Sequence, residues 1–331
     1  MSLTTEYLGI RLPHPLIAGA SPMAENLDTV KQLEDSGAAA IVMNSLFEEE
    51  LNAEATATTA AFEEFAESFH EAPSYLPSLG DQAFEGPEEY LDRLVRIRKA
   101  LSIPVIGSLN GVSVGGWLHY AKLIEEAGAD GIELNVYDVE VSPEISGEQI
   151  EHNLIHLVST IRSLISIPVA IKLGPHYTAL PNLVKRLEAA GADGVVLFNR
   201  LFQPDFDVEE LDVYRLAMTE PAQLPPRLHW LAILSGQTSL SLGITGGVSS
   251  TVDVIKCLMA GAHGVQMVTA LYRNGPSFLS RVRSALQEWM EIHEYESVDA
   301  LRGCLSWQRC PEPSVYQRGN YVKTIKTWQP K

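Results

Sequence analysis

Cysteine is scarce in this sequence, with only Cys257, Cys304 and Cys310 among 331 residues. Three cysteines cannot pair into a disulfide framework, and no CxxC pair is present to begin a structural zinc site. We therefore expect neither a disulfide framework nor a metal site.

Long apolar runs and an excess of positive charge are also missing. No stretch reaches the ~18 apolar residues of a membrane helix, and the first residues, MSLTTEYLGIRLPHP, lack the basic and apolar regions of a secretory signal. The formal net charge is −18, from 24 Lys and Arg against 42 Asp and Glu. Such a chain is repelled by nucleic-acid phosphates and anionic lipids. These absences predict a cytoplasmic protein that binds neither nucleic acid nor membranes.

What is present is a short pattern that recurs four times. An amphipathic run ends at Gly37, Gly128, Gly191 or Gly261, and a short apolar run follows each glycine. Glycine readily takes the left-handed conformation that ends a helix. The runs that follow, AIVMNS, GIELNV, GVVLFN and GVQMVT, are rich in β-branched residues, as buried parallel strands are. The pattern predicts four helix-to-strand units.

Four further strands are predicted from PLIAGAS, PVIGSLN, PVAIKLG and LSLGITGG, with amphipathic runs such as EEYLDRLVRIRKAL between the strands. Eight alternating units predict an α/β fold, a (β/α)8 TIM barrel, built as a single domain over residues 1–331. The alternative is a doubly wound open sheet, which rarely needs eight such regular units. No GxGxxG opens a helix after the first strand, which also favours the barrel.

Two segments fall outside the repeat. Residues 46–87 form an acidic, alanine-rich insertion after the second strand, with a helix predicted near Ala53–Phe69. Insertions after barrel strands lie on the catalytic face, so this one is either a lid or a solvated helical addition. Residues 296–331 form a tail with Trp and Tyr, which we expect to pack on the barrel or on a second subunit.

Functional residues of this fold lie at the carboxyl ends of the strands. The predicted ends carry Ala20, Ser21, Asn44, Ser45, Asn110, Asn135, Lys172, Asn199, Gly246, Gly247, Val268 and Thr269. Buried amides without a partner cost ~1–3 kcal/mol each, so several asparagines at strand ends indicate a ligand with which they form hydrogen bonds.

The last two strand ends predict a phosphate site. LGITGGVSS places two glycines between a strand and a helix, and MVTAL follows the neighbouring strand. Backbone N–H groups at a helix amino terminus bind anions, and barrels commonly hold phosphate after strands seven and eight. A plain turn is the alternative interpretation.

Lys172 ends the predicted strand in IKLGP. A cation at a barrel mouth is costly unless it faces an anion. A reduced flavin is such an anion, and Lys172 would stabilise it. A structural ion pair with a neighbouring carboxylate is the competing explanation.

With these residues in place, the chain resembles the dihydroorotate dehydrogenase family over nearly its whole length. The resemblance runs from YLGIRLPHPLIAGAS through GADGIELNV and IKLGP to GITGGVSSTVDVIKCLMAGAHGVQMVTALYRNGP. It implies an FMN-dependent oxidoreductase acting on CH–CH groups. By resemblance, the phosphate of FMN is held by Gly246, Gly247, Val268 and Thr269. By resemblance too, Ala20, Ser21, Ser45, Asn110, Asn135 and Lys172 lie along the rest of the cofactor, and Asn199 binds substrate or flavin.

Departures from the family pattern concern the substrate. The family usually has a Ser/Cys-Pro-Asn run after the fourth strand, and here Asp138 falls at the position of the base and Glu140 at that of the substrate-binding Asn. Asn44 stands where a Lys is usual. We take Asp138 as the proposed base, with Tyr137 as a second acid–base residue. Exposed loop residues are the alternative for Asp138 and Glu140.

These changes remove one positive charge and add two potential negative charges, which predicts a neutral or cationic substrate in place of orotate. Three alternatives remain. One is a genuine dihydroorotate dehydrogenase of pyrimidine biosynthesis with a divergent base. Another is a flavin electron-transfer subunit without its own substrate, and the third is a phosphate-binding lyase or isomerase without flavin. A homodimer and a redox partner protein are both compatible with the sequence.

Overall fold

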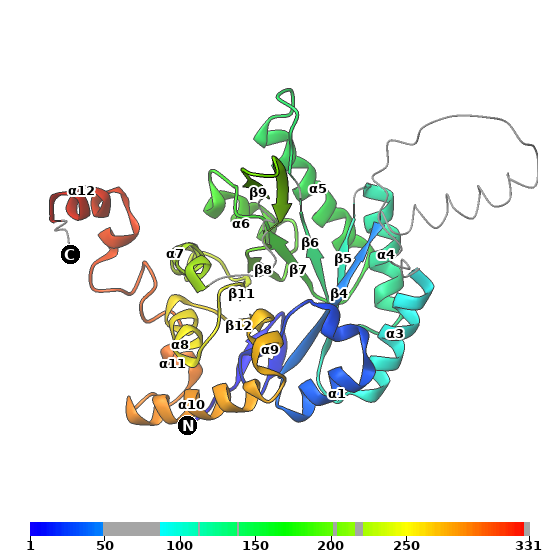
Figure 1. Ribbon diagram of the computed structural model, residues 1–331, viewed down its shortest axis with the longest axis horizontal. Helices are drawn as coiled ribbons and strands as arrows, with labels where there is room; N and C mark the ends of the chain where they lie inside the picture. Colours follow the sequence, from blue (N-terminus) through cyan, green and yellow to red (C-terminus); the bar gives the residue numbers. More distant parts are fainter. Residues whose placement is uncertain (49–86, 112, 138, 201–203, 216–220, 328–331) are drawn as a thin grey trace, which may run out of the picture.

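The computed structural model describes residues 1–48, 87–111, 113–137, 139–200, 204–215 and 221–327. Eight parallel strands close into a barrel in the order β11-β12-β3-β4-β5-β6-β7-β8, and helices surround it (Figure 1). The predicted (β/α)8 TIM barrel is therefore confirmed. The barrel strands are β3 (Leu16–Ala18), β4 (Ala40–Phe47), β5 (Val105–Asn110), β6 (Gly131–Asn135), β7 (Val169–Leu173), β8 (Gly194–Leu197), β11 (Ser241–Thr245) and β12 (Gly264–Met267).

The helices follow the strands as predicted, with α7 and α9 to α12 added to the runs seen in the sequence. They are α1 (Leu27–Asp35), α3 (Pro87–Ala100), α4 (Val114–Glu126), α5 (Gly147–Leu164), α6 (Leu180–Ala189), α7 (Leu224–Leu234), α8 (Thr251–Ala260), α9 (Thr269–Asn274), α10 (Phe278–Ile292), α11 (Val298–Leu301) and α12 (Arg318–Thr327). Short 3₁₀ helices are η1 (Pro22–Glu25), η2 (Pro221–Gln223) and η3 (Pro313–Tyr316). No helix in these described ranges is long and apolar enough to cross a membrane.

A repeated glutamate links successive units of the barrel. Glu125 accepts hydrogen bonds from the backbone N–H and the hydroxyl of Ser166, at 2.6 and 2.7 Å. Glu34 makes the same pair of bonds with Ser102, and Glu188 with Ser239. Hydrogen bonds from Lys122 and Ser166 lower the pKa of Glu125 to about 2. Each carboxylate thus fastens the end of one helix to the turn before a later strand.

The amino-terminal hairpin packs against the end of the barrel at which the strands begin. Its strands β1 (Thr5–Tyr7) and β2 (Ile10–Leu12) are antiparallel, and Tyr7, Leu8 and Leu12 join the apolar cluster inside the barrel. A Cβ on Gly194 would lie 2.5 Å from Leu8, and one on Gly243 would lie 2.8 Å from the Tyr7 hydroxyl. Glycine is needed at both positions because the hairpin occupies that space. The other end of the barrel is left for a site.

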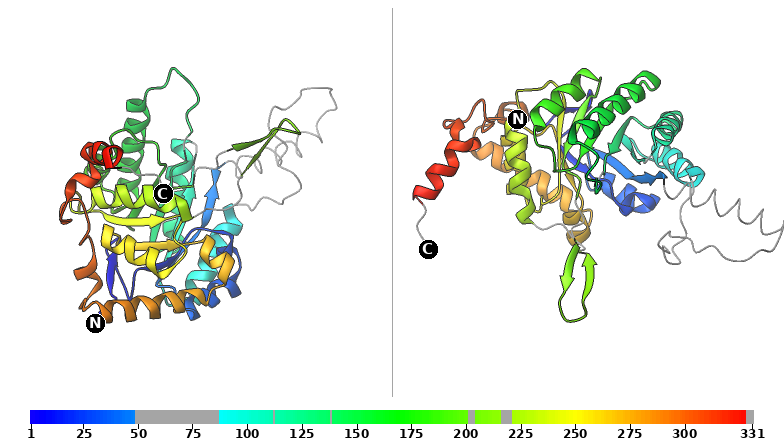
Figure 2. Two further views of the ribbon diagram at one scale, coloured as in Figure 1. Left: turned by 60° about the vertical axis from the view of Figure 1, so that its left-hand side comes forward. Right: turned by 90° about the horizontal axis from the view of Figure 1, so that it is seen from above.

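Two further parts extend from the barrel. The hairpin of β9 (Pro204–Asp207) and β10 (Asp212–Arg215) projects away from it, and α12 stands apart from it at the carboxyl terminus (Figure 2). Residues 297–310 of the predicted tail pack on the barrel. There the backbone N–H of Trp307 donates to the carbonyl of Ala232 at 2.9 Å. The predicted insertion 46–87 lies almost wholly outside the described residues, including the helix expected near Ala53–Phe69.

Candidate functional site

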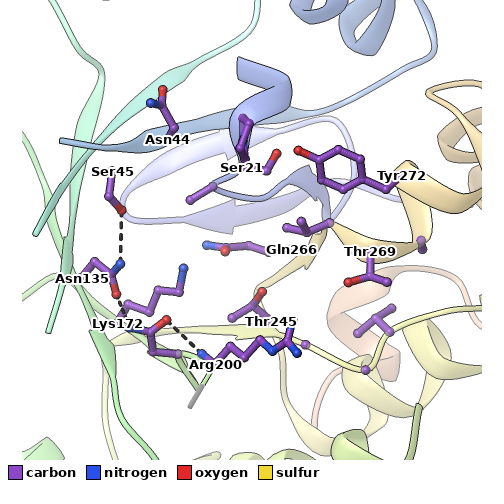
Figure 3. Close-up of a pocket in the computed structure, with 18 of the residues that line it drawn as sticks. Ser21, Asn44, Ser45, Asn135, Lys172, Arg200, Thr245, Gln266, Thr269 and Tyr272 are labelled. Atoms are coloured by element: carbon purple, nitrogen blue, oxygen red, sulfur yellow. Dashed lines mark hydrogen bonds between the residues drawn. The ribbon is translucent and has the colours of Figure 1, made fainter. Parts of the chain in front are cut away.

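A cavity of about 1150 Å³ lies at the carboxyl ends of the barrel strands. Residues within or shortly after β3, β4, β6, β7, β8, β11 and β12 contribute to its lining (Figure 3). The predicted site residues in this lining are Ala20, Ser21, Asn44, Ser45, Asn135, Lys172, Asn199, Gly246, Gly247, Val268 and Thr269. Residues far apart in the sequence therefore meet because parallel strands end at the same side of the barrel.

Three predicted residues lie elsewhere. Asn110 is buried at the end of β5, outside the lining. Tyr137 is 39% exposed, and Glu140 is exposed with its carboxylate accepting from the N–H of Ser142 at 2.6 Å. Asp138 lies outside the described residues.

The centre of the cavity carries a buried ion pair. Lys172 Nζ lies 3.3 Å from Glu133 Oε1, and Glu133 is only 1% exposed. Gln266 Nε2 donates to the other carboxylate oxygen of Glu133, while Gln266 Oε1 is buried and has no hydrogen-bond partner within the described chain. The lysine charge is therefore balanced from inside the barrel. The free amide oxygen beside it can accept a hydrogen bond from a ligand.

Hydrogen bonds join polar side chains of β4, β5 and β6 to the segment after β8, and Figure 3 shows Ser45, Asn135 and Arg200 among these residues. Ser108 and Ser45 share a hydrogen bond of 2.9 Å, and Asn135 Nδ2 donates to Ser45 Oγ at 3.2 Å. Asn199 donates to Asn135 Oδ1, and the backbone N–H of Arg200 donates to Asn199 Oδ1 at 2.9 Å. Buried amides held in a network have fixed orientations. This wall of the cavity is therefore pre-organised.

The double glycine after β11 forms a second wall. Gly246 and Gly247 have φ of +89° and +79°, the region that favours glycine. A Cβ on Gly247 would lie 2.7 Å from the backbone N of Leu224. Val268 and Thr269 begin α9 on the neighbouring strand end, also in the lining. The backbone here can approach an anion closely, as the predicted phosphate site requires.

Four arginines in the lining were not predicted from the sequence: Arg93, Arg200, Arg227 and Arg273. The side chain of Arg200 runs across the cavity toward Thr245 (Figure 3). Burial lowers the pKa of Arg200 and of Arg227. These arginines give the cavity positive charge that the sequence analysis did not include. The prediction of a neutral or cationic substrate therefore depends only on Asn44, Asp138 and Glu140.

Asn44 lies beside an acidic residue of the cavity lining. Asn44 Nδ2 donates to Glu25 Oε1 at 3.4 Å, and Asn44 Oδ1 is buried with no hydrogen-bond partner in the described ranges. Glu25 and Glu89 are acidic residues of this lining. Where a lysine was expected by resemblance, the structure therefore has an amide beside a carboxylate. Within the described residues no group of three or more His, Cys, Asp or Glu could hold a metal ion.

Comparison with known proteins links this chain to one family. The profile of the family described as dihydroorotate dehydrogenase matches residues 2–290. The chain is 28% identical to a protein of Thermoplasma acidophilum named dihydroorotate dehydrogenase B (NAD(+)), catalytic subunit, over 91% of this chain and 98% of that protein. Proteins with the same name from Thermoplasma volcanium and Methanothermobacter thermautotrophicus are 27% and 25% identical, each over 91% of this chain and 97% of the relative.

Proposed function

This chain belongs to the dihydroorotate dehydrogenase family, and from that premise we propose that it is an FMN-dependent oxidoreductase. Membership implies an oxidoreductase that acts on CH–CH groups. The reaction proposed is hydride transfer between a small cyclic substrate and flavin N5. The observation that carries the proposal is one cavity that joins the Gly246–Gly247 wall to the Lys172–Glu133 pair.

The residues present fit FMN. The double glycine lines the cavity without side chains, which supports close approach of a phosphate to its backbone. The buried Gln266 Oε1 supports a ligand that carries a hydrogen-bond donor. We therefore assign the phosphate to Gly246, Gly247, Val268 and Thr269. The remainder of the cofactor is assigned to Ala20, Ser21, Ser45, Asn135 and Lys172, and Asn110, which lies outside the lining, is left out.

FMN, when bound, supplies a two-electron acceptor. In this proposal Lys172 would be one of the residues that hold the cofactor, and its ammonium would favour the negatively charged reduced form. Glu133 holds the ammonium in place and offsets its charge inside the barrel. Gln266 orients the carboxylate through its hydrogen bond. The amide row of Asn135 and Asn199 fixes the orientation of the ligand.

Proton transfer is assigned to the loop after β6. We assign the base to Asp138, since a carboxylate can serve as a general base that accepts a proton from carbon. Asn44 and Asn199, which line the cavity, are assigned to substrate binding. Tyr137 and Glu140 lie outside the lining, so the predicted acid–base role of Tyr137 and the predicted substrate contact of Glu140 are not carried into the proposal.

The substrate proposed is a compound other than dihydroorotate. Asn44 lies beside Glu25, where the family usually has a lysine, so a substrate carboxylate would lack that cation and meet a carboxylate. The loop after β6 also lacks the Ser/Cys-Pro-Asn run.

A redox partner protein is part of the proposal. The relatives from Thermoplasma and Methanothermobacter are named as catalytic subunits. We extend this to the present chain and propose a partner subunit that carries electrons away from the flavin. A cytoplasmic location is proposed with it.

Identification of the released flavin tests the proposal. The purified full chain is denatured, and the supernatant is separated by chromatography against FMN, FAD and riboflavin. We expect FMN in near-stoichiometric amount. A chain that releases no flavin, and that binds none when FMN is added, would contradict the proposal.

A further inference from the structure

Arg227 is a buried arginine on the wall of the cavity. It lies in α7, is only 8% exposed and lines the cavity beside the double glycine. A Cβ on Gly246 would lie 2.9 Å from Arg227 Nε and 3.0 Å from Arg227 Nη2. The plane of the guanidinium is therefore packed against the glycine, and any larger residue at 246 would displace it.

The hydrogen bonds of Arg227 leave its charge unbalanced. Nε donates to the carbonyl of Thr245 at 2.7 Å, Nη1 to that of Gln223 at 2.7 Å, and Nη2 to that of Phe198 at 3.5 Å. These acceptors are neutral, and none of the ion pairs within the described ranges involves Arg227. A buried cation is costly without an anion nearby. The cavity is where that anion can lie.

We propose that Arg227 is a specificity-determining residue that provides the positive charge facing the phosphate of the bound cofactor, and so selects a phosphorylated flavin over riboflavin. The inference rests on the proposed function. Arginine suits this role because its planar fork binds phosphate oxygens through two N–H groups and stays charged when buried. Three of its five N–H groups hold the ends of β8, β11 and η2, which fixes the guanidinium in place.

The test compares FMN with riboflavin, which lacks the phosphate. Flavin is removed from the purified full chain, and dissociation constants are measured by quenching of flavin fluorescence for the wild type, Arg227→Gln and Arg227→Lys. The matched control is Arg162→Gln. Arg162 also donates to backbone carbonyls, those of Ile165 and Ile167, and packs 2.9 Å from a Cβ on Gly191, which also has positive φ, but it lies outside the lining.

We expect Arg227→Gln to weaken FMN binding on the order of 10- to 100-fold, as removal of a charged hydrogen-bond partner does, and to leave riboflavin binding within about 3-fold. The salt dependence of FMN affinity should fall with it. Arg227→Lys should recover part of the preference for FMN, and Arg162→Gln should leave the ratio of the two constants unchanged.

Two results would overturn the inference. If Arg227→Gln weakens FMN and riboflavin equally, Arg227 only supports the fold, and the proposed function stands. If the wild type binds neither flavin, the proposed function fails and the inference fails with it.

Discussion

Lys172 Nζ lies 3.3 Å from Glu133 Oε1 inside the barrel, with the lysine at the end of β7 and the glutamate within β6. The structural ion pair that the sequence offered as one explanation of Lys172 is therefore present, and the role of Lys172 toward a flavin stays a proposal. The lysine has a structural partner below it and still lines the cavity above it. A cation balanced from inside the barrel can face a ligand without depending on it for stability.

Substitution of Lys172 by Met should destabilise the protein by about 3–5 kcal/mol, because Glu133 is left buried without its cation. The double variant Lys172→Met, Glu133→Gln should recover most of that loss, since the carboxylate is no longer charged. Urea unfolding measures both, with Lys122→Met, which removes an exposed ion pair, as the control. If flavin binds, both variants should lower its reduction potential. Equal stability of the single and double variants would contradict the account.

Gly247→Ala should abolish tight FMN binding. A Cβ there would lie 2.7 Å from the backbone N of Leu224, so the loop that approaches the phosphate must move. Gly128→Ala is the matched control, because Gly128 has φ of +89° and nothing within 4 Å of an added Cβ. Both should lose about 1–2 kcal/mol of stability from backbone strain. Only Gly247→Ala should lose FMN affinity in a fluorescence titration; equal FMN affinity in the two variants would remove the glycine cradle from the account.

Asp138→Asn should leave FMN bound and abolish reduction of the flavin by the natural substrate, because the amide cannot accept the proton. Glu140→Gln is the companion variant, since Glu140 is exposed and bonded to the N–H of Ser142. Stopped-flow reduction with an active substrate measures both rates. A rate for Asp138→Asn equal to that of the wild type would exclude Asp138 as the base.

The residues at strand ends could be predicted from the sequence because the fold dictates where they meet. Eight parallel strands bring Ser45, Asn135 and Lys172 together whatever the helices between them look like. The two glycines of the double-glycine turn could also be predicted, because glycine favours the positive φ that such a turn needs. These parts of the fold and site depend on the periodicity of apolar residues and on glycines at helix ends and turns. Both are local features of the sequence.

Glu133 and Gln266 could not be found in the same way. Both lie within strands that are buried on the inner and outer faces, so apolar periodicity does not show which side chains point into the barrel. The one available signal was a polar residue inside an apolar run, GIELN and GVQM. Arg227 is harder still, because its place beside Gly246 depends on how α7 packs against β11.

The free energy of unfolding should fall as the pH is lowered from 6.5 to 4, because of His14. Burial, followed by the charge of Arg283, lowers the pKa of His14 from 6.5 to about 4, so the unfolded chain binds the proton more readily than the folded chain in that interval. Stability is full above 6.5 and is lost as the pH falls, on the order of 3 kcal/mol. His14→Asn keeps an acceptor for the N–H of Leu16 and should flatten this slope in thermal unfolding. The exposed His176→Asn should leave the slope unchanged; a similar flattening in both variants would contradict the assignment to His14.

The visible spectrum of the purified protein, recorded anaerobically before and after addition of dihydroorotate, tests the central claim most directly. The account predicts a flavin band that persists with dihydroorotate and bleaches with dithionite, because FMN is bound and the substrate is a different compound. A colourless protein that takes up no FMN would contradict the cofactor assignment, and a band bleached by dihydroorotate would contradict the assignment of a different substrate.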